Sequence, residues 1–216
     1  MSDMRQLTEA GRRIEESSFA LIDAEAGAHA HSPAEWQVVR RIIHATADFD
    51  FARTLAFGPG AVEAGVAALR AGATVLADVQ MIVAGLSRDR LAAFGCAARC
   101  FIGDADVISA ARAAGSTRAA AAMRKAARAG LLDGALVAIG NAPTALAEVQ
   151  RLVLEEGARP ALVVGVPVGF VGAAEAKEAA LTLPVPHLVA RGRKGGTPVA
   201  VAAVHALLGL AAEAAP

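Results

Sequence analysis

The chain has 216 residues, of which 55% are hydrophobic but only 4% aromatic, and its formal net charge is +0. A chain of this length fits one ordinary domain and can bury a substantial core without disulfides. The neutral charge argues against a surface that binds nucleic acid or an anionic membrane non-specifically, because such surfaces need a basic excess. A small anionic ligand held by a local group of basic residues remains compatible with it.

The sequence also predicts the cellular location of the protein and the state of its two cysteines. No apolar run reaches the length of a membrane span, and the first residues carry no apolar core typical of a signal peptide. We therefore expect a cytoplasmic protein. The two cysteines, Cys96 and Cys100, have no second pair and no nearby histidine. They predict ordinary thiols rather than a zinc site or a disulfide framework.

The first third of the chain predicts helices. Residues 4–26 have apolar positions near helical spacing, with Gly11 as a weak point. Ser32 and Pro33 then open a second helix, as N-cap and first helical residue. Residues 58–72 predict a third helix.

The rest of the chain alternates short apolar runs with helical segments. Most of these runs are followed by a turn of small residues and then a helix, which predicts a parallel sheet covered on both faces. No linker marks a domain boundary, so we expect one α/β domain over 1–216, with a helical N-terminal extension. The predicted sheet is mainly parallel and five-stranded, with strands at 74–78, 98–102, 135–140, 161–167 and 187–192.

Glycine-rich loops follow three of the predicted strands. They read IGNAPTA, GVPVGFVGAAEAKEA and RGRKGGT. In parallel sheets, ligands bind beyond the carboxyl ends of the strands. The loops are either ordinary tight turns or parts of one binding site, and three of them on one predicted face favour the site. The candidate ligand-binding residues in these loops are Asn141, Lys177, Arg191, Arg193 and Lys194.

Common catalytic and cofactor motifs are absent. No strand is followed by G-x-G-x-x-G, and neither a P-loop nor a G-x-S-x-G motif occurs. Metal-ligand spacing is absent as well. His29 and His31 lie in a predicted loop and are interpreted as solvated. His187 opens a strand and His205 lies in the last helix, so both are interpreted as structural.

His44 remains as a candidate catalyst. At about 100° per residue, Val39, Ile42, Ile43 and Ala47 fall in one apolar sector of the second helix. His44 falls on the opposite side, together with Gln37, Arg40 and Arg41. It is therefore either a surface histidine or part of an anion site. Two arginines three and four residues before it lie close enough to interact with the imidazole.

Several ordered blocks resemble one enzyme family. They are ESSFALI, RIIHAT, FGPGAV, ADVQMIVAG, STRAAAA, VAIGNAPTAL, VVGVPVGFVGAAEAKEA and RGRKGG. Together they resemble the precorrin-8X methylmutase family of cobalamin biosynthesis, from about residue 11 to 208. The resemblance implies a flavodoxin-like parallel α/β fold. It also implies a homodimer with the substrate bound near the subunit interface.

The resemblance further implies an isomerase. This family moves a methyl group from C-11 to C-12 of precorrin-8X to give hydrogenobyrinic acid, with no cofactor and no metal. The family's catalytic histidine matches His44, and its substrate-contacting serine and arginine match Ser18 and Arg41. Arg118 of STRA and the basic residues of RGRKGG match further substrate contacts. Arginine suits an acidic substrate because its planar fork bonds both oxygens of a carboxylate.

Some positions depart from the family pattern, and other functions stay open. Ser17, Gln80, Ala84 and Ser116 stand where the family often has Arg, Glu, His and Asn. These departures affect fine substrate contacts more than the reaction type. The alternatives are a cobalt-precorrin-8 methylmutase of the anaerobic route, a non-catalytic corrinoid carrier, and a general binder of small anions.

Overall fold

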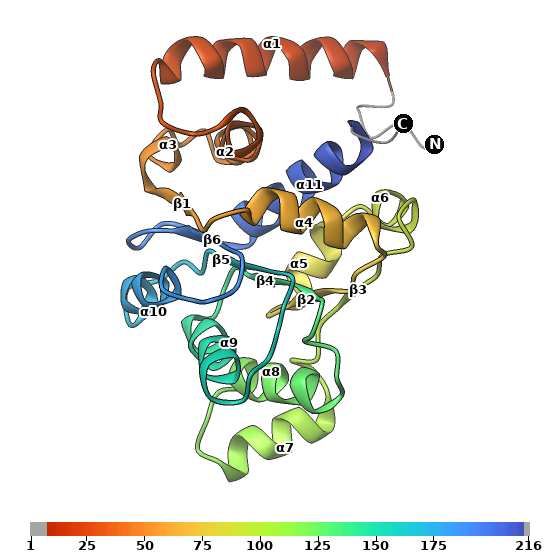
Figure 1. Cartoon of the computed structure of the whole chain (residues 1–216), viewed down its shortest axis with the longest axis vertical. Coiled ribbons are helices and arrows are strands. Elements are labelled where there is room, and N and C mark those ends of the chain that lie inside the picture. The colour runs from red at the N-terminus through yellow and green to blue at the C-terminus, as the bar shows by residue number, and fades with distance from the viewer. Residues whose placement is uncertain (1–7, 214–216) are drawn as a thin grey trace.

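The computed structural model describes residues 8–213, and its centre is one mixed sheet of six strands (Figure 1). The strand order is β1-β6-β5-β4-β2-β3, in which β2 to β6 run parallel and β1 runs antiparallel to β6. The strands are β1 (Leu55–Phe57), β2 (Val75–Ala77), β3 (Ala98–Arg99), β4 (Leu136–Ile139), β5 (Leu162–Gly165) and β6 (His187–Ala190).

The predicted count of five strands is wrong, because the sheet has a sixth strand at its edge. Each predicted strand region contains one of the parallel strands, whereas β1 was not predicted. Strand β1 has three residues and follows a helical turn directly, so no alternation of apolar and polar residues can develop along it. It is held by its register with β6, in which Leu55 pairs with Ala190 and Phe57 with Leu188.

Both faces of the sheet are buried, as predicted. Along β4, Leu136 and Ala138 point to one core, and Val137 and Ile139 point to the other. All four are fully buried, which explains why the strand is a continuous apolar run rather than an alternating one.

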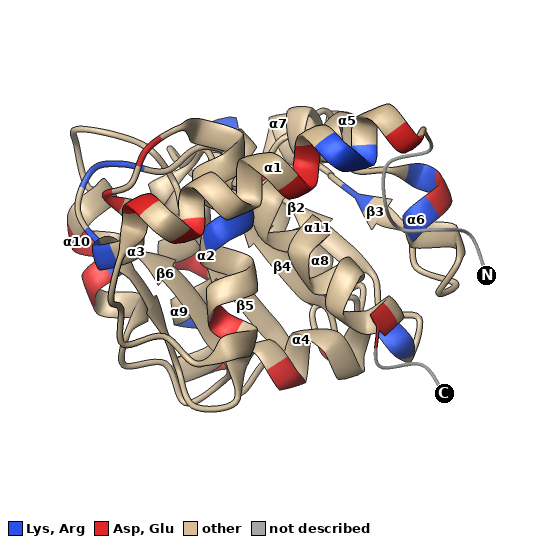
Figure 2. Ribbon diagram, turned by 90° about the horizontal axis from the view of Figure 1, so that it is seen from above, with Lys and Arg blue, Asp and Glu red and all other residues tan. Residues whose placement is uncertain are grey.

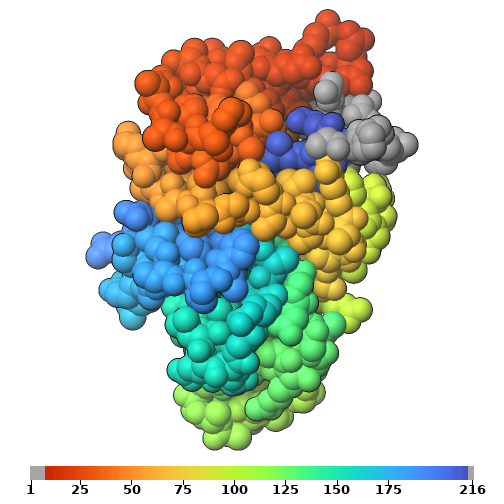
Figure 3. All heavy atoms as spheres, viewed as in Figure 1, coloured from red at the N-terminus to blue at the C-terminus, as the bar shows by residue number. Residues whose placement is uncertain are grey.

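The helices divide between the two faces, and the space-filling view shows the resulting layers in chain colours (Figure 3). One core is completed by α2 (Pro33–Thr46), α4 (Ala61–Arg70), α5 (Gln80–Gly85), α6 (Arg88–Ala92) and α11 (Thr197–Glu213). The other is completed by α7 (Ala105–Ala113), α8 (Arg118–Arg128), α9 (Pro143–Glu155) and α10 (Ala173–Ala180). Among the described residues, no helix is long and apolar enough to cross a membrane.

The N-terminal extension is the outermost layer. Helix α1 (Glu9–Ala26) lies on α2 at one end of the molecule (Figure 1), and the short α3 (Phe51–Thr54) leads into β1. The start of the helix predicted over 4–26 lies outside the described residues. Gly11 lies inside α1, where its N–H donates to the Thr8 side chain and so helps to cap the helix.

Helix α2 begins as predicted. Ser32 accepts from the Glu35 N–H, Glu35 accepts from the Ser32 N–H, and Pro33 is the first helical residue. The predicted core positions Val39, Ile42 and Ile43 are buried.

The prediction for Ala47 is wrong. It is exposed and forms the C-cap of α2 with φ 53°, because the helix ends before Ala47 can reach the apolar face.

The loops after β5 and β6 are joined by backbone hydrogen bonds. Gly196 N–H donates to the Val166 carbonyl over 2.8 Å, and Gly169 N–H donates to the Arg193 carbonyl over 3.2 Å. A Cβ at Gly195 would lie 2.2 Å from the Val166 carbonyl oxygen, so only glycine allows this approach.

We therefore expect Gly195→Ala to destabilise the fold by about 3 kcal/mol, because the backbone of both loops has to shift. Urea unfolding followed by circular dichroism measures the change. Gly103→Ala is the control, since a Cβ there meets nothing within 4 Å. Equal unfolding midpoints for the two variants would show that the loops do not depend on this contact.

Candidate active site

The predicted residues His44 and Arg41 meet around one aromatic ring. His44 is exposed on the last turn of α2, and its ring centroid lies 5.3 Å from that of Phe19 on α1. The guanidinium groups of Arg40 and Arg41 lie 4.4 Å and 4.9 Å from the same centroid. Ser18, next to Phe19, donates its hydroxyl to the Ile14 carbonyl. We call Ser18, Phe19, Arg40, Arg41 and His44 the α1–α2 cluster.

Phe19 was not predicted as a site residue. It lies in the ESSFALI block of the sequence. However, a phenylalanine in an amphipathic helix can equally be a core residue or a ring that contacts cationic side chains. The packing of α1 on α2 decides between these roles, since it sets the Phe19 ring against two guanidinium groups.

Acidic residues of α1 hold both arginines in place. Arg41 pairs with Glu15 at 2.5 Å, and Arg40 pairs with Asp23 at 2.8 Å. In the view from above, acidic and basic positions of α1 and α2 lie beside one another (Figure 2). Ion pairs near a surface contribute only about 0–1 kcal/mol. The Asp23 carboxylate is 41% exposed, so a carboxylate ligand can replace it at little cost. Glu15 is only 12% exposed, and its displacement would leave a largely buried charge without a partner.

A hollow of about 240 Å³ adjoins this cluster, between α1, α2 and α11. It is lined by Glu15, Phe19, Arg40 and Arg41, and by His205 from α11. The N–H of Ser87 donates to Nε2 of His205, which is the structural role predicted for this histidine.

A buried carboxylate organises the loop after β4. Asp78, directly after β2, accepts hydrogen bonds from the N–H groups of Gly140, Asn141 and Ala142 at 3.1, 2.9 and 2.6 Å. It binds the loop that leads into α9, up to the N–H of the N-cap residue Ala142, which has no side chain that can cap the helix. Burial raises the pKa of Asp78, and the three N–H bonds oppose this rise.

The same carboxylate positions a predicted site residue. With its N–H held by Asp78, Asn141 keeps its side chain exposed at the strand ends. Asp78 itself was missed in the sequence, because a single aspartate after a strand does not reveal three N–H partners more than sixty residues away.

Arg118 lies at this edge too. It is exposed at the start of α8, where the N-cap Thr117 bonds Thr144 at the start of α9, hydroxyl to hydroxyl, over 2.8 Å. The structure thus brings Arg118 to the side of the sheet that carries Asn141.

The loop after β6, residues 191–196, is called the β6 loop. Its basic residues differ in their surroundings. Arg191 and Arg193 are exposed, and the guanidinium of Arg193 lies 5.5 Å from the Phe170 ring. Lys194 donates to both Asp48 and Asp50 at 2.6 Å, in the turn that follows α2. These bonds lower the pKa of Asp50 and raise that of Lys194. They join the strand-end residues to the helix that carries His44.

Lys177 lies inside the protein rather than at its surface. Its side chain is fully buried, and Nζ donates to the Lys194 carbonyl over 2.7 Å. Burial lowers the pKa of Lys177 to about 8. Its ammonium therefore faces the β6 loop, unlike the exposed arginines of that loop.

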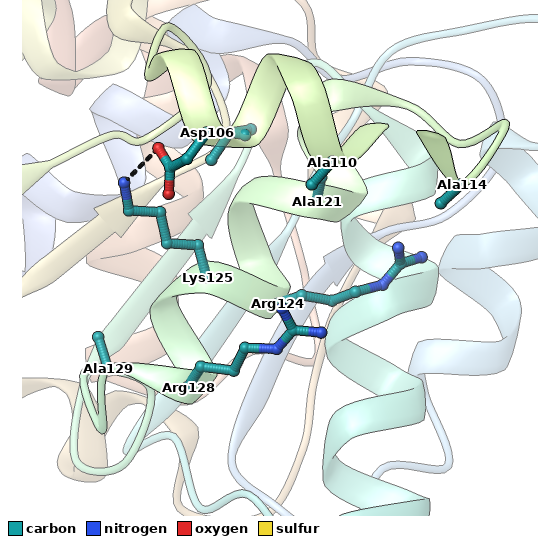
Figure 4. A pocket seen from close by; sticks show the side chains of 9 residues that line it. Asp106, Ala110, Ala114, Ala121, Arg124, Lys125, Arg128 and Ala129 are labelled. Atoms are coloured by element: carbon teal, nitrogen blue, oxygen red, sulfur yellow. Dashed lines mark hydrogen bonds and ion pairs between the residues drawn. The ribbon is translucent and has the colours of Figure 1, made fainter. Parts of the chain in front are cut away.

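A second hollow, of about 460 Å³, lies between α7 and α8 at the far end of the molecule from α1 (Figures 1 and 4). Arg124, Lys125 and Arg128 line it. Lys125 already pairs with Asp104 and Asp106, and Arg124 pairs with Glu148. This hollow lies on the opposite face of the sheet from α2, so it is separate from the site formed by the α1–α2 cluster and the β6 loop.

The remaining histidines are packing residues. His187 is buried, with Nδ1 2.9 Å from the Val185 carbonyl, as expected for a structural histidine. His29 is exposed and stacks on Trp36 at 3.9 Å. The prediction that His31 is solvated is wrong. It is half-buried, with Nε2 2.8 Å from the Ala52 carbonyl, because the loop folds back onto α3.

The cysteines and two of the departures from the family pattern have ordinary surroundings. Cys96 and Cys100 are free thiols. The Gln80 amide donates to the Cys100 carbonyl, and Ser116 accepts from Arg124 over 3.4 Å. Within residues 8–213, no group of three His, Cys, Asp or Glu side chains is arranged to hold a metal ion.

Comparisons with known proteins agree on one family. The precorrin-8X methylmutase family model matches residues 13–210. The cobalt-precorrin-8 methylmutase of Leptospira interrogans is 50% identical over 216 residues, which cover 97% of this chain and 98% of the relative. The precorrin-8X methylmutase of Pseudomonas aeruginosa is 44% identical over 200 residues, covering 91% and 94%.

A solved structure agrees with these relatives. The precorrin-8X methylmutase crystal structure from Thermus thermophilus superposes with a TM-score of 0.88 at 52% identity. The match covers 94% of this chain and 97% of that chain.

His205 makes the stability of the fold depend on pH. Burial, with smaller contributions from Arg90 and Arg41, lowers its pKa from 6.5 to about 4. Between these values the unfolded chain binds a proton that the folded chain does not. The stabilisation is therefore complete above pH 6.5 and is lost as the pH falls, by up to about 3 kcal/mol.

We expect His205→Gln, which keeps an acceptor and does not titrate, to lose less stability than the wild type between pH 7 and pH 4. Urea unfolding at both pH values measures this difference. The exposed His29→Gln is the control and is expected to follow the wild type. A pH dependence unchanged in His205→Gln would contradict the prediction.

Proposed function

Because the chain belongs to the precorrin-8X methylmutase family, we propose that it moves a methyl group from C-11 to C-12 of precorrin-8X and yields hydrogenobyrinic acid. Family and relatives identify it as an isomerase of cobalamin biosynthesis. The observation that carries the proposed mechanism is the α1–α2 cluster, in which an exposed imidazole lies beside two guanidinium groups.

In this proposal His44 is the catalytic residue. A 1,5-sigmatropic shift moves the methyl within the substrate, so it needs no covalent nucleophile, cofactor or metal. His44 donates a proton or a hydrogen bond to a ring nitrogen and steers electron demand in the conjugated system. General acid help of this kind contributes about 10²–10⁴-fold in rate.

The remaining residues bind and orient the acidic side chains of the substrate. Arg41 and Ser18 act beside His44, and Arg191, Arg193 and Lys194 act from the β6 loop. From the neighbouring strand ends, Arg118 and Asn141 complete the set. The neutral net charge of the chain is compatible with this role, because the cations are concentrated locally.

A second substrate has an observation in its favour. The relative that is 50% identical over nearly the whole chain is named cobalt-precorrin-8 methylmutase. We therefore propose cobalt-precorrin-8 as the alternative substrate for the same reaction. A corrinoid carrier or a simple anion binder has no comparable support, since the relatives are named as methylmutases.

We also propose that the chain works as a homodimer with the site near the interface. Ile14 and Leu21 on α1 are 68% and 62% exposed. They lie one turn before and one turn after Ser18, so the predicted substrate-contacting serine lies on an exposed apolar stripe. A second copy of the chain packed on this stripe would cover the stripe and border the α1–α2 cluster.

Three broader proposals complete this function. The match over residues 13–210 supports one methylmutase-like domain over 1–216. The order of the parallel strands, β3-β2-β4-β5-β6, supports a flavodoxin-like sheet. The biosynthetic role of the family supports action in the cytoplasm.

The first test follows the absorption spectrum of the purified protein mixed with precorrin-8X. We expect the wild type to produce the spectrum of hydrogenobyrinic acid and His44→Ala to be slower by about 10²–10⁴-fold. His29→Ala is the matched control at another exposed histidine and is expected to keep full turnover. Retention of the substrate without conversion would reject this substrate, and the cobalt form is then tested in the same way.

The dimer is tested by sedimentation velocity on Leu21→Glu. A buried charge in place of an apolar contact is expected to raise the dimer dissociation constant at least about tenfold. Leu154→Glu is the control, because Leu154 is 63% exposed on α9, on the opposite side of the sheet. A wild-type monomer, or equal effects of the two substitutions, would contradict this interface.

A further inference from the structure

Lys177 is a buried cation without an acidic partner. Its side chain is fully buried on α10, and its Nζ donates a hydrogen bond to the Lys194 carbonyl over 2.7 Å. Burying an ammonium costs free energy unless a counter-charge and hydrogen bonds compensate it. Within residues 8–213, no carboxylate pairs with it. A methionine would fill the same space without this cost.

Lys194, whose carbonyl accepts the hydrogen bond from Lys177, also connects the β6 loop to the turn after α2. The Lys194 carbonyl accepts from Lys177, and the Lys194 ammonium donates to Asp48 and Asp50. These two aspartates follow the last turn of α2, where His44 is located. A further link comes from the Arg191 N–H, which donates to the Thr54 carbonyl over 2.8 Å.

The turn that receives Lys194 is well anchored to α2. The Thr46 hydroxyl donates to the Ile42 carbonyl and accepts from the Asp48 N–H, and the Asp48 carboxylate accepts from the Asp50 N–H. A displacement of the β6 loop is therefore transmitted to the end of α2, or the ion pairs to Asp48 and Asp50 break.

We propose that Lys177 is a positioning residue, which anchors the β6 loop through the Lys194 carbonyl and so fixes Arg191 and Arg193 relative to His44. This inference rests on the proposed function, and it reassigns Lys177 from direct substrate contact to support of the loop. The lowered pKa of Lys177 agrees with it, because folding this charged side chain reduces stability at neutral pH.

The proposal separates activity from stability in Lys177→Met. The variant loses the donor to the loop but also loses the buried charge. We expect its melting temperature to equal or exceed that of the wild type, and its kcat with precorrin-8X to fall about 10–100-fold. A residue that only holds the fold together would show the opposite, a lower melting temperature with kcat per folded molecule unchanged.

The chain offers a matched control. It has three lysines, and Lys125 lies on α8, far from the β6 loop. Lys125→Met changes the net charge equally and is expected to leave kcat unchanged. Lys194→Met breaks the link to Asp48 and Asp50 while keeping its carbonyl. If both lysines act through one link, the double variant loses less activity than the product of the single losses.

Hydrogen exchange at residues 191–196 provides a readout that does not depend on turnover. Faster exchange in Lys177→Met than in Lys125→Met supports the anchoring of the β6 loop by Lys177. This holds even if the wild type does not convert precorrin-8X, because that failure counts against the proposed function alone. Unchanged exchange or a kcat within twofold of the wild type would overturn the positioning role.

Discussion

The candidate site depends on how the N-terminal helices are attached to the sheet: α2 packs its buried face against α11, β1 pairs with β6, and Lys194 adds two ion pairs. The α1–α2 cluster belongs to an outer layer, whereas Arg191 and Arg193 follow β6, which lies next to the edge strand of the sheet. Two ion pairs from one ammonium, to Asp48 and Asp50, connect these layers beside α2. Exposed ion pairs contribute little to stability, so their effect here is on geometry. They add to the buried packing of α2 and the pairing of β1 with β6, which together hold His44 relative to the basic loop.

Three cations of the proposed site already have acidic partners in the ligand-free protein. Arg40 and Arg41 each have an acidic partner on α1, and Lys194 has two in the α2–α3 turn. At these three positions an anionic ligand would exchange one carboxylate for another, whereas it would add a counter-charge to the exposed Arg118, Arg191 and Arg193. Such an exchange changes the Coulomb energy little, and selectivity then depends on shape and on the placement of several carboxylates at once.

Much of this arrangement was predictable, and the misses have physical reasons. Helical periodicity places His44 opposite Val39 and Ile42, and the structure has it exposed. Strand β1 was missed because three residues are too few to show an alternation of apolar and polar side chains. Its pairing partner, β6, is also far away in the sequence. The burial of Lys177 was missed because its helix consists of alanines, glutamates and this lysine, a composition that does not show which face is buried. Only the packing of α10 reveals which way the lysine points.

Asp78 occupies backbone N–H groups at the strand ends, which favours the proposal that the ligand is bound by side chains. In doubly wound sheets the switch point, which here lies between β2 and β4, usually offers backbone N–H groups to an anionic ligand. In this protein the N–H groups of Gly140, Asn141 and Ala142 are already bonded to the Asp78 carboxylate. A phosphate would have to displace a buried carboxylate to bind there. The proposed ligand, with several dispersed carboxylates, would instead bind the exposed side chains of Arg118, Arg191 and Arg193.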